Sequence, residues 1–115
     1  MFDFEKLDVY RVVKDLNTKT YTFLSEINNI DEHVINEWKK ASLAVVKNLA
    51  EGVGRTSNED KRNFIIVSRA NVFICVAILQ SLQGLKLIEE GVYQEFYNDY
   101  ETASKMLLGM FRSFK

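Results

Sequence analysis

Apolar residues recur every three, four or seven positions along almost the whole chain, which is the period of an α-helix. The first such stripe predicts a helix from Asp3 to about Ile27, and Asn28-Asn29 supplies the turn that ends it. The apolar positions of this helix are Val9, Val13, Leu16, Phe23 and Ile27.

A second helical stripe follows Asp31, whose side chain is suited to cap a helix N-terminus. Gly52 and Gly54 predict the end of this helix, because glycine readily adopts the left-handed conformation in which helices commonly terminate. The apolar positions of the stripe are Val34, Trp38, Ala41, Val45, Leu49 and Val53.

Ser57, with Asp60 three residues later, resembles a capping box and predicts the start of the longest helix, which extends to about Leu87. Residues 72–79 are apolar on every face of this helix, and their β-branched content would also suit a buried strand. No turn signal interrupts residues 57–83, and strands in globular proteins seldom exceed about ten residues. Length therefore favours the helix.

After a short break around residues 88–91, a last helical stripe contains Val92, Phe96, Tyr100, Ala103, Leu107, Met110 and Phe114. Four long amphipathic segments joined by short connections predict an all-α fold, namely an antiparallel up-down-up-down four-helix bundle. A chain of 115 residues has room for one core, so we expect a single domain over residues 1–115.

The apolar third helix has a further implication, because an isolated four-helix bundle buries only one stripe of each helix. We expect a homo-oligomer in which the second face of this helix is covered by other copies of the chain. The alternative is that the neighbouring helices of the same chain wrap the third helix completely.

Composition narrows the chemistry. The chain has 47% hydrophobic residues and no proline, which favours long ordered helices. Its N-terminus lacks the features of a signal peptide, and its longest apolar run has eight residues, so we expect a cytoplasmic protein without a membrane span.

Cys75 is the only cysteine and His33 the only histidine, so neither a disulfide nor a metal cluster is expected. We find no set of catalytic residues and expect no cofactor and no enzymatic activity.

The junction between the second and third helices gathers unusual polar residues. Asn48, Glu51 and Arg55 are spaced to line one edge of a helix, and Arg55 can offset the unfavourable position of Glu51 near a helix C-terminus. The structural interpretation is that Asn48 and Glu51 hydrogen-bond to the turn of residues 52–57. The functional alternative is that Arg55 contacts a phosphate that Glu51 orients. The structural corner comprises Asn48, Glu51, Gly52, Gly54 and Ser57.

Charge is unevenly distributed along the sequence. Residues 39–69 contain seven basic and three acidic residues, a net charge of +4, whereas residues 89–101 contain five acidic residues and no basic one. Such charges are common on the solvated faces of helical bundles, but a basic segment repeated around an oligomer would also attract nucleic acid. The candidate nucleic-acid-binding residues are Lys39, Lys40, Lys47, Arg55 and Arg62.

Several short motifs resemble the four-helix bundle family of 23S rRNA intervening-sequence proteins. They are Phe4-x-x-Leu7-x-Val9-Tyr10, Lys39-Lys40-Ala41, Asn48-x-Ala50-Glu51-Gly52-x-Gly54-Arg55, Phe64, and Ser104-Lys105-Met106-Leu107-x-Gly109. The resemblance implies a small bacterial bundle, similar to the accessory protein of diversity-generating retroelements, that forms a ring-shaped homopentamer. The chain departs from the family pattern at Val46, at Ile74 in place of a glutamate, and at Ala77 in place of a polar residue. The departures at positions 74 and 77 make the third helix more apolar and remove a carboxylate that the core might otherwise hold.

Two functions are compatible with these features. The first is a non-enzymatic, ring-like homo-oligomer that acts as an accessory protein on nucleic acid. The second is a scaffold that recruits another protein through the acidic last helix or through the face of the ring, and that binds no nucleic acid. Binding to RNA or DNA at low salt discriminates between them.

Overall fold

The computed structural model describes residues 1–115, and all of its regular structure is helical. The elements are a short 3-10 helix, η1 (Asp3–Lys6), and the α-helices α1 (Asp8–Glu26), α2 (Glu32–Val53), α3 (Asn58–Gly84) and α4 (Glu90–Ser113). Residues 72–79 lie within α3, so the helical interpretation of this apolar segment is confirmed. The predicted all-α fold with four helices is also confirmed.

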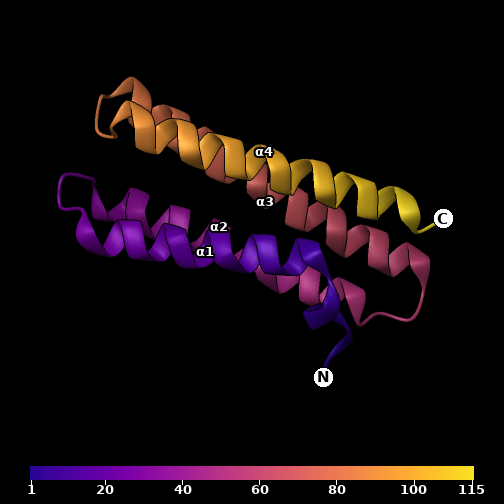
Figure 1. Ribbon diagram of the computed structural model, residues 1–115. Helices are drawn as coiled ribbons and strands as arrows, with labels where there is room; N and C mark the ends of the chain where they lie inside the picture. The colour runs from indigo at the N-terminus through magenta and orange to yellow at the C-terminus, as the bar shows by residue number, and fades with distance from the viewer.

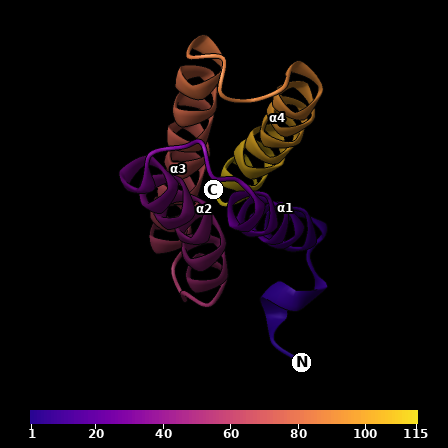
Figure 2. The same ribbon diagram turned by 90° about the vertical axis from the view of Figure 1, so that its left-hand side faces the viewer.

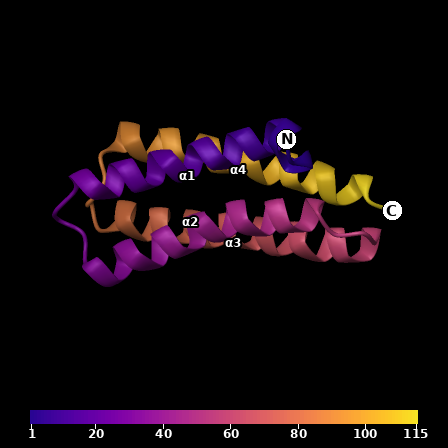
Figure 3. The ribbon, with the colours of Figure 1, turned by 90° about the horizontal axis from the view of Figure 1, so that it is seen from below.

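Each helix runs antiparallel to the next, because rising residue numbers in one helix meet falling numbers in its neighbour. Between α1 and α2, Asn17 contacts Ser42 and Tyr21 contacts Lys39. Between α2 and α3, Val45 contacts Ser68 and Gly52 contacts Phe64. Between α3 and α4, Arg62 contacts Phe114 and Arg69 contacts Ser104. The four helices lie along a common long axis, and both ends of the chain lie at the same end of the bundle (Figure 1). Seen from below, α1 and α4 form one layer and α2 and α3 the other (Figure 3).

Two predicted helix starts are confirmed by their caps. The Asp31 carboxylate accepts a hydrogen bond of 2.7 Å from the backbone N–H of His33, and α2 begins at the next residue after Asp31. The Ser57 hydroxyl accepts one of 3.1 Å from the N–H of Asp60 at the start of α3. Each cap satisfies a backbone donor that has no partner within its helix.

The first predicted helix is divided in the structure. Leu7 has extended backbone angles (φ −88°, ψ 132°), so residues 3–6 form η1 and α1 starts only at Asp8. The Glu5 carboxylate accepts a hydrogen bond of 2.6 Å from the N–H of Phe2, which closes η1 locally. The Phe4 ring then packs edge-on against Tyr10 at 4.7 Å between ring centres. Apolar spacing alone could not reveal this break, because it continues through both elements.

The predicted role of Gly52 and Gly54 is wrong. No glycine has a positive φ, and Gly54 has right-handed helical angles (φ −80°, ψ −7°). Gly52 is a buried residue of α2, and a Cβ atom added to it would lie 2.7 Å from the Cβ of Phe64 on α3. Glycine is therefore needed at position 52 for the close approach of two helices, not for a left-handed turn.

The end of α3 provides the left-handed residue instead. Lys86 has φ 59°, and the N–H of Leu87 donates to the carbonyl of Leu82, which closes the helix end. The helix stops at Gly84, three residues before the predicted end.

The centre of the core combines aromatic packing with a small hydrogen-bonded cluster. The indole N–H of Trp38 donates to the hydroxyl of Tyr100 at 2.8 Å, and the hydroxyl of Thr20 lies 3.2 Å from the same oxygen. Phe96 packs against Trp38 with 5.4 Å between ring centres. All four side chains are buried, and their polar atoms are satisfied within the core. This cluster joins α1, α2 and α4.

The sequence analysis expected no membrane span because no unbroken apolar run is long enough. The composition of α3 as a whole does not fully support this expectation. By length and composition α3 is sufficiently apolar to cross a bilayer, with a mean hydropathy of 1.9 over its most apolar 18 residues. A core helix of a helical bundle meets the same criterion, and the inner side of α3 does pack in the core. Only 33% of that window is buried within the chain.

Candidate functional site

The side of α3 that points away from the other helices is apolar and uncovered. We call it the outer face of α3. The exposed fractions of Ile66, Val67 and Ile74 are 40%, 45% and 47%. Viewed along the bundle, α3 occupies one corner, with α2 and α4 as its neighbours (Figure 2). The alternative that neighbouring helices wrap α3 completely is therefore wrong. The residues of the outer face are Ile66, Val67, Ala70, Ile74 and Ala77.

The corner between α2 and α3 differs in part from its prediction. The amide of Asn48 donates to the carbonyl of Ala44 at 2.8 Å, one turn back in its own helix, and does not bond to the turn. The Glu51 carboxylate pairs with the Arg55 guanidinium at 2.5 Å, as expected for the compensation of Glu51 near a helix C-terminus. The guanidinium also lies over the Phe64 ring, 4.6 Å from its centre. Arg55 is thus fixed by contacts within the chain.

The five candidate nucleic-acid-binding residues do not form one site. Lys39 and Lys40 lie in the first half of α2, and the ammonium of Lys39 is 5.4 Å from the centre of the Tyr21 ring. Lys47 is exposed nearly two turns before the end of α2, next in sequence to Asn48 of the corner between α2 and α3. Arg62 donates a hydrogen bond to the backbone carbonyl of Phe114. The structure separates the first two lysines from the other three residues along the bundle.

This separation reflects a polarity of the whole molecule. We divide the bundle at mid-length. The antiparallel contacts place Ser42, Ser68 and Ser104 at about the same level along the bundle, and the dividing line lies close to these three residues. The half formed by residues 1–14, 46–69 and 104–115 has eleven lysines and arginines and six acids, a net charge of +5. The other half, residues 15–45 and 70–103, has four lysines and arginines and ten acids, a net charge of −6. We call them the basic half and the acidic half.

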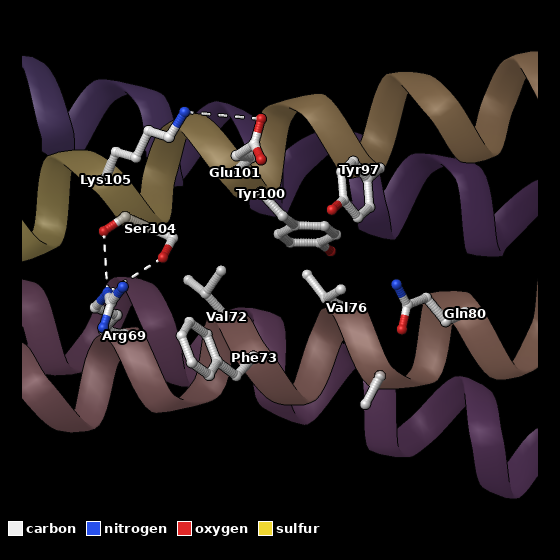
Figure 4. Close-up of a pocket in the computed structure, with 11 residues that line it drawn as sticks. Arg69, Val72, Phe73, Val76, Gln80, Tyr97, Tyr100, Glu101, Ser104 and Lys105 are labelled. Atoms are coloured by element: carbon white, nitrogen blue, oxygen red, sulfur yellow. Dashed lines mark hydrogen bonds and ion pairs between the residues drawn. The ribbon is translucent and has the colours of Figure 1, made fainter.

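A groove of about 450 Å³ lies between α3 and α4 and crosses from the basic half into the acidic half. Figure 4 shows Arg69 and Ser104 at one end, Val72 and Phe73 in the middle, and Tyr97 and Gln80 at the other end. The Arg69 guanidinium donates through Nε to the backbone carbonyl and to the hydroxyl of Ser104, both at 3.2 Å. It also lies over the Phe73 ring at 4.8 Å from its centre.

The remaining charges of the groove belong to α4. Lys105 and Glu101 form a loose ion pair, with 3.9 Å between Nζ and Oε1, and the Lys105 side chain is 75% exposed. The groove is thus an apolar channel with two cations and one carboxylate along its edge.

Comparisons with known proteins give the family. A family model described as 23S rRNA-intervening sequence protein matches residues 5–109, which is nearly the whole chain. The chain belongs to this family. No curated protein matches it.

A solved structure supports the fold of this 23S rRNA-intervening sequence protein family member. It is the crystal structure of a protein with unknown function from the S23 ribosomal protein family of Bacteroides thetaiotaomicron VPI-5482. The match has a TM-score of 0.85 at 14% sequence identity, and covers 90% of this chain and 97% of the other. The identity is low, so this likeness shows the common fold alone. The predicted family is confirmed, and neither comparison assigns an activity.

Within this family member, the two departures on α3 lie away from the core. Ile74 and Ala77 are exposed residues of the outer face. The expectation that Ile74 replaces a core carboxylate is therefore wrong, because position 74 points away from the core of a single chain. An isoleucine and an alanine at these positions enlarge the apolar surface of the outer face.

The buried titratable groups of this family member are held uncharged. Burial raises the pKa of the Cys75 thiol to about 12, although a hydrogen bond with Tyr100 acts in the opposite direction. Burial also raises the pKa of the Tyr100 hydroxyl above its ordinary value. A thiol that remains protonated at neutral pH is a poor nucleophile.

An ion cluster between α1 and α4 was missed by the sequence analysis. The Lys19 ammonium lies 2.7 Å from Glu95 and 2.7 Å from Asp99. Burial lowers the pKa of Lys19, but hydrogen bonds and charge attraction from Asp99 and Glu95 outweigh it and raise that pKa. Glu95 and Asp99 lie one helical turn apart on α4, but Lys19 is 80 positions from Asp99 in the sequence, and no local spacing links the lysine to the two acids.

Proposed function

We propose that the protein is a non-enzymatic, ring-like homo-oligomer, a pentamer, that acts in the cytoplasm as an accessory protein on nucleic acid. The observation that carries the proposal is the uncovered outer face of α3 in a chain whose other helices are amphipathic. The pentamer is the stoichiometry expected from the family resemblance.

A second copy of the chain is the partner that best fits the outer face. The face has no charged residue, and its large residues Ile66 and Ile74 alternate with Ala70 and Ala77. Small residues between large ones allow another helix to approach closely and to interdigitate. Soluble proteins rarely leave an apolar stripe of this length exposed, which supports burial in an assembly.

The basic half supports the nucleic-acid part of the proposal. It contains Lys47, Arg55 and Arg62 of the candidate set, whereas Lys39 and Lys40 lie in the acidic half. In a ring of parallel copies, the basic halves would lie side by side, and weak phosphate contacts would be multiplied. We therefore assign nucleic-acid association to the basic half, and give Lys39 and Lys40 no part in it.

Light scattering combined with size-exclusion chromatography tests the assembly. We expect the wild-type chain, of 13.4 kDa, to elute as a complex of five copies and the Ile74→Lys variant as a smaller species. Leu43→Lys is the matched control, because Leu43 is 40% exposed but lies on α2. A wild-type monomer at micromolar concentration would contradict the proposal, and so would a monomer that sediments with phospholipid vesicles.

Titration with a labelled RNA tests the association with nucleic acid. We expect binding at 50 mM salt that weakens about tenfold or more at 200 mM, because several phosphates are neutralised. Absence of binding at low salt would leave the protein-recruiting scaffold as the better function, and the net charge of −6 on the acidic half favours a basic protein as its partner.

A further inference from the structure

The groove between α3 and α4 lies beside the outer face of α3 and shares Ala77 with it. Val72, Val76 and Tyr100 line the groove, and Val72 and Tyr100 also belong to the core. The other residues of the outer face, Ile66, Val67, Ala70 and Ile74, do not line it. A groove of about 450 Å³ lies within the range of small-ligand sites, about 300 to 1,000 Å³. What it binds depends on the groups along its edges.

Cations continue from the groove toward the basic end of the bundle. Arg62 lies two helical turns before Arg69 on the same side of α3, and Arg112 lies two turns after Lys105 on the same side of α4. Because α3 and α4 are antiparallel, both pairs extend in the same direction along the bundle. Glu101 is the single acid among the lining residues of the groove. This arrangement is complementary to a chain of negative charges.

Aromatic rings add a second kind of contact. Phe73 is 54% exposed, and the Arg69 guanidinium covers part of its ring while Ser104 holds that guanidinium in place. Tyr97 lines the same groove from α4 (Figure 4). Exposed aromatic rings beside fixed arginines are the elements with which proteins bind single-stranded nucleic acid, because each unpaired base can stack on a ring.

We infer that the groove between α3 and α4 binds single-stranded nucleic acid, with backbone phosphates at Arg69 and Lys105 and an unpaired base against Phe73 and Tyr97. The inference rests on the proposed nucleic-acid association and names its site and its substrate class. A duplex is disfavoured, because its bases are already stacked inside the helix and offer no free face to Phe73. An acidic peptide would satisfy the cations but would leave the rings without a stacking partner.

Fluorescence anisotropy with three labelled probes tests this site. The probes are a 12-nucleotide RNA strand, a duplex of the same sequence, and the strand with its bases removed but its phosphates kept. We expect the wild-type protein to bind the intact strand about tenfold more tightly than the base-free strand, since stacking contributes about 1–3 kcal/mol per base.

Variants locate the site. Lys105→Gln changes an exposed side chain, so the fold should be retained, and Arg69→Gln removes the second cation. We expect each to weaken binding of the intact strand about three- to tenfold. Phe73→Leu keeps an apolar side chain and should abolish the preference for the intact strand over the base-free strand. Lys39→Gln in the acidic half is the control and should leave both affinities within about twofold. Light scattering and circular dichroism verify assembly and helical content for every variant.

The outcomes separate this inference from the proposed function. If the wild-type protein binds RNA and the Lys105→Gln and Phe73→Leu variants bind it with the same affinity, the groove is not the binding site, whereas the general association with nucleic acid stands. Equal affinity for the intact and base-free strands, or full competition by polyglutamate, would overturn base stacking in the groove. If no probe binds at low salt, the proposed association itself fails.

Discussion

The inner and outer faces of α3 are similar in apolar character but opposite in environment. The inner face, which includes Ile65, Val72 and Leu79, is fully buried among the other helices. The outer face, which includes Val67 and Ile74, is nearly half exposed. Hydrophobicity therefore does not by itself mark the core of this helix. The geometry of a four-helix bundle covers one side of each helix, and an apolar second side indicates an additional partner.

The largest expected effect comes from placing a charge on each face in turn. Leu79→Asp should prevent folding, because an unpaired buried charge costs several kcal/mol, against a total stability of about 5–15 kcal/mol. Ile74→Asp should keep its helical content and unfold cooperatively, because the new charge on the isolated chain faces water. Circular dichroism during urea titration compares the two. Similar loss of structure in both variants would show that the faces are equivalent.

The buried thiol of the inner face makes stability depend on alkaline pH. The pKa of Cys75 is raised from 9.0 to about 12 in the folded chain. The contribution of the protonated thiol to the free energy of unfolding is therefore complete below pH 9 and is lost between pH 9 and 12. The loss amounts to at most about 4 kcal/mol at pH 12. The raised pKa of Tyr100 likewise lowers the stability of the fold as the pH rises above 10, and the raised pKa of Lys19 does so above pH 10.5.

Chemical denaturation from pH 8 to pH 11 measures this dependence. We expect Cys75→Ala to lose less free energy of unfolding over that range than the wild-type chain, although it starts from a lower value because of the cavity. Parallel pH profiles for the two chains would refute a protonated thiol on the inner face. Ile74→Cys is the matched control, since a thiol on the outer face of a monomeric chain should add no such dependence.

A smaller effect tests how tightly α3 is held by α2. A methyl group at Gly52 would overlap the Cβ of Phe64, so Gly52→Ala should destabilise the chain by about 1–3 kcal/mol. Gly109 also lies within a helix, but no atom lies within 4 Å of an added Cβ there. Gly109→Ala should stabilise the chain by about 0.5–1 kcal/mol, because alanine favours the helix more than glycine does. Thermal unfolding of both variants would reveal whether contact or propensity dominates at position 52.

Sequence periodicity predicted the four helices because each stripe is long and repeats without interruption. It could not detect the break at Leu7, where a local hydrogen bond from Phe2 to Glu5 and the packing of Phe4 override a continuous apolar pattern. It also misassigned Gly52, since a glycine at a helix end has two different uses. One use is a left-handed turn, and the other is close contact between helices, which depends on the neighbouring helix.

The candidate surfaces were predictable only in part. The excess of apolar residues on α3 was visible in the sequence, and it led to the expectation of an uncovered face. The division into basic and acidic halves was not, because it depends on the antiparallel order that brings residues 1–14, 46–69 and 104–115 together. The same order unites Arg69 with Ser104 across 35 positions of sequence. Local spacing contains no information on such pairs.

The hydrogen bond from Trp38 to Tyr100 has a practical consequence. Trp38 is the only tryptophan and is fully buried, so all indole fluorescence of the chain originates from one site in the core. That site contacts α1 and α4, whereas the outer face belongs to α3. The emission of Trp38 is therefore a built-in optical signal for loss of the fold. Compared with a measurement of size, it would reveal whether copies of the chain separate before they unfold or only as they unfold.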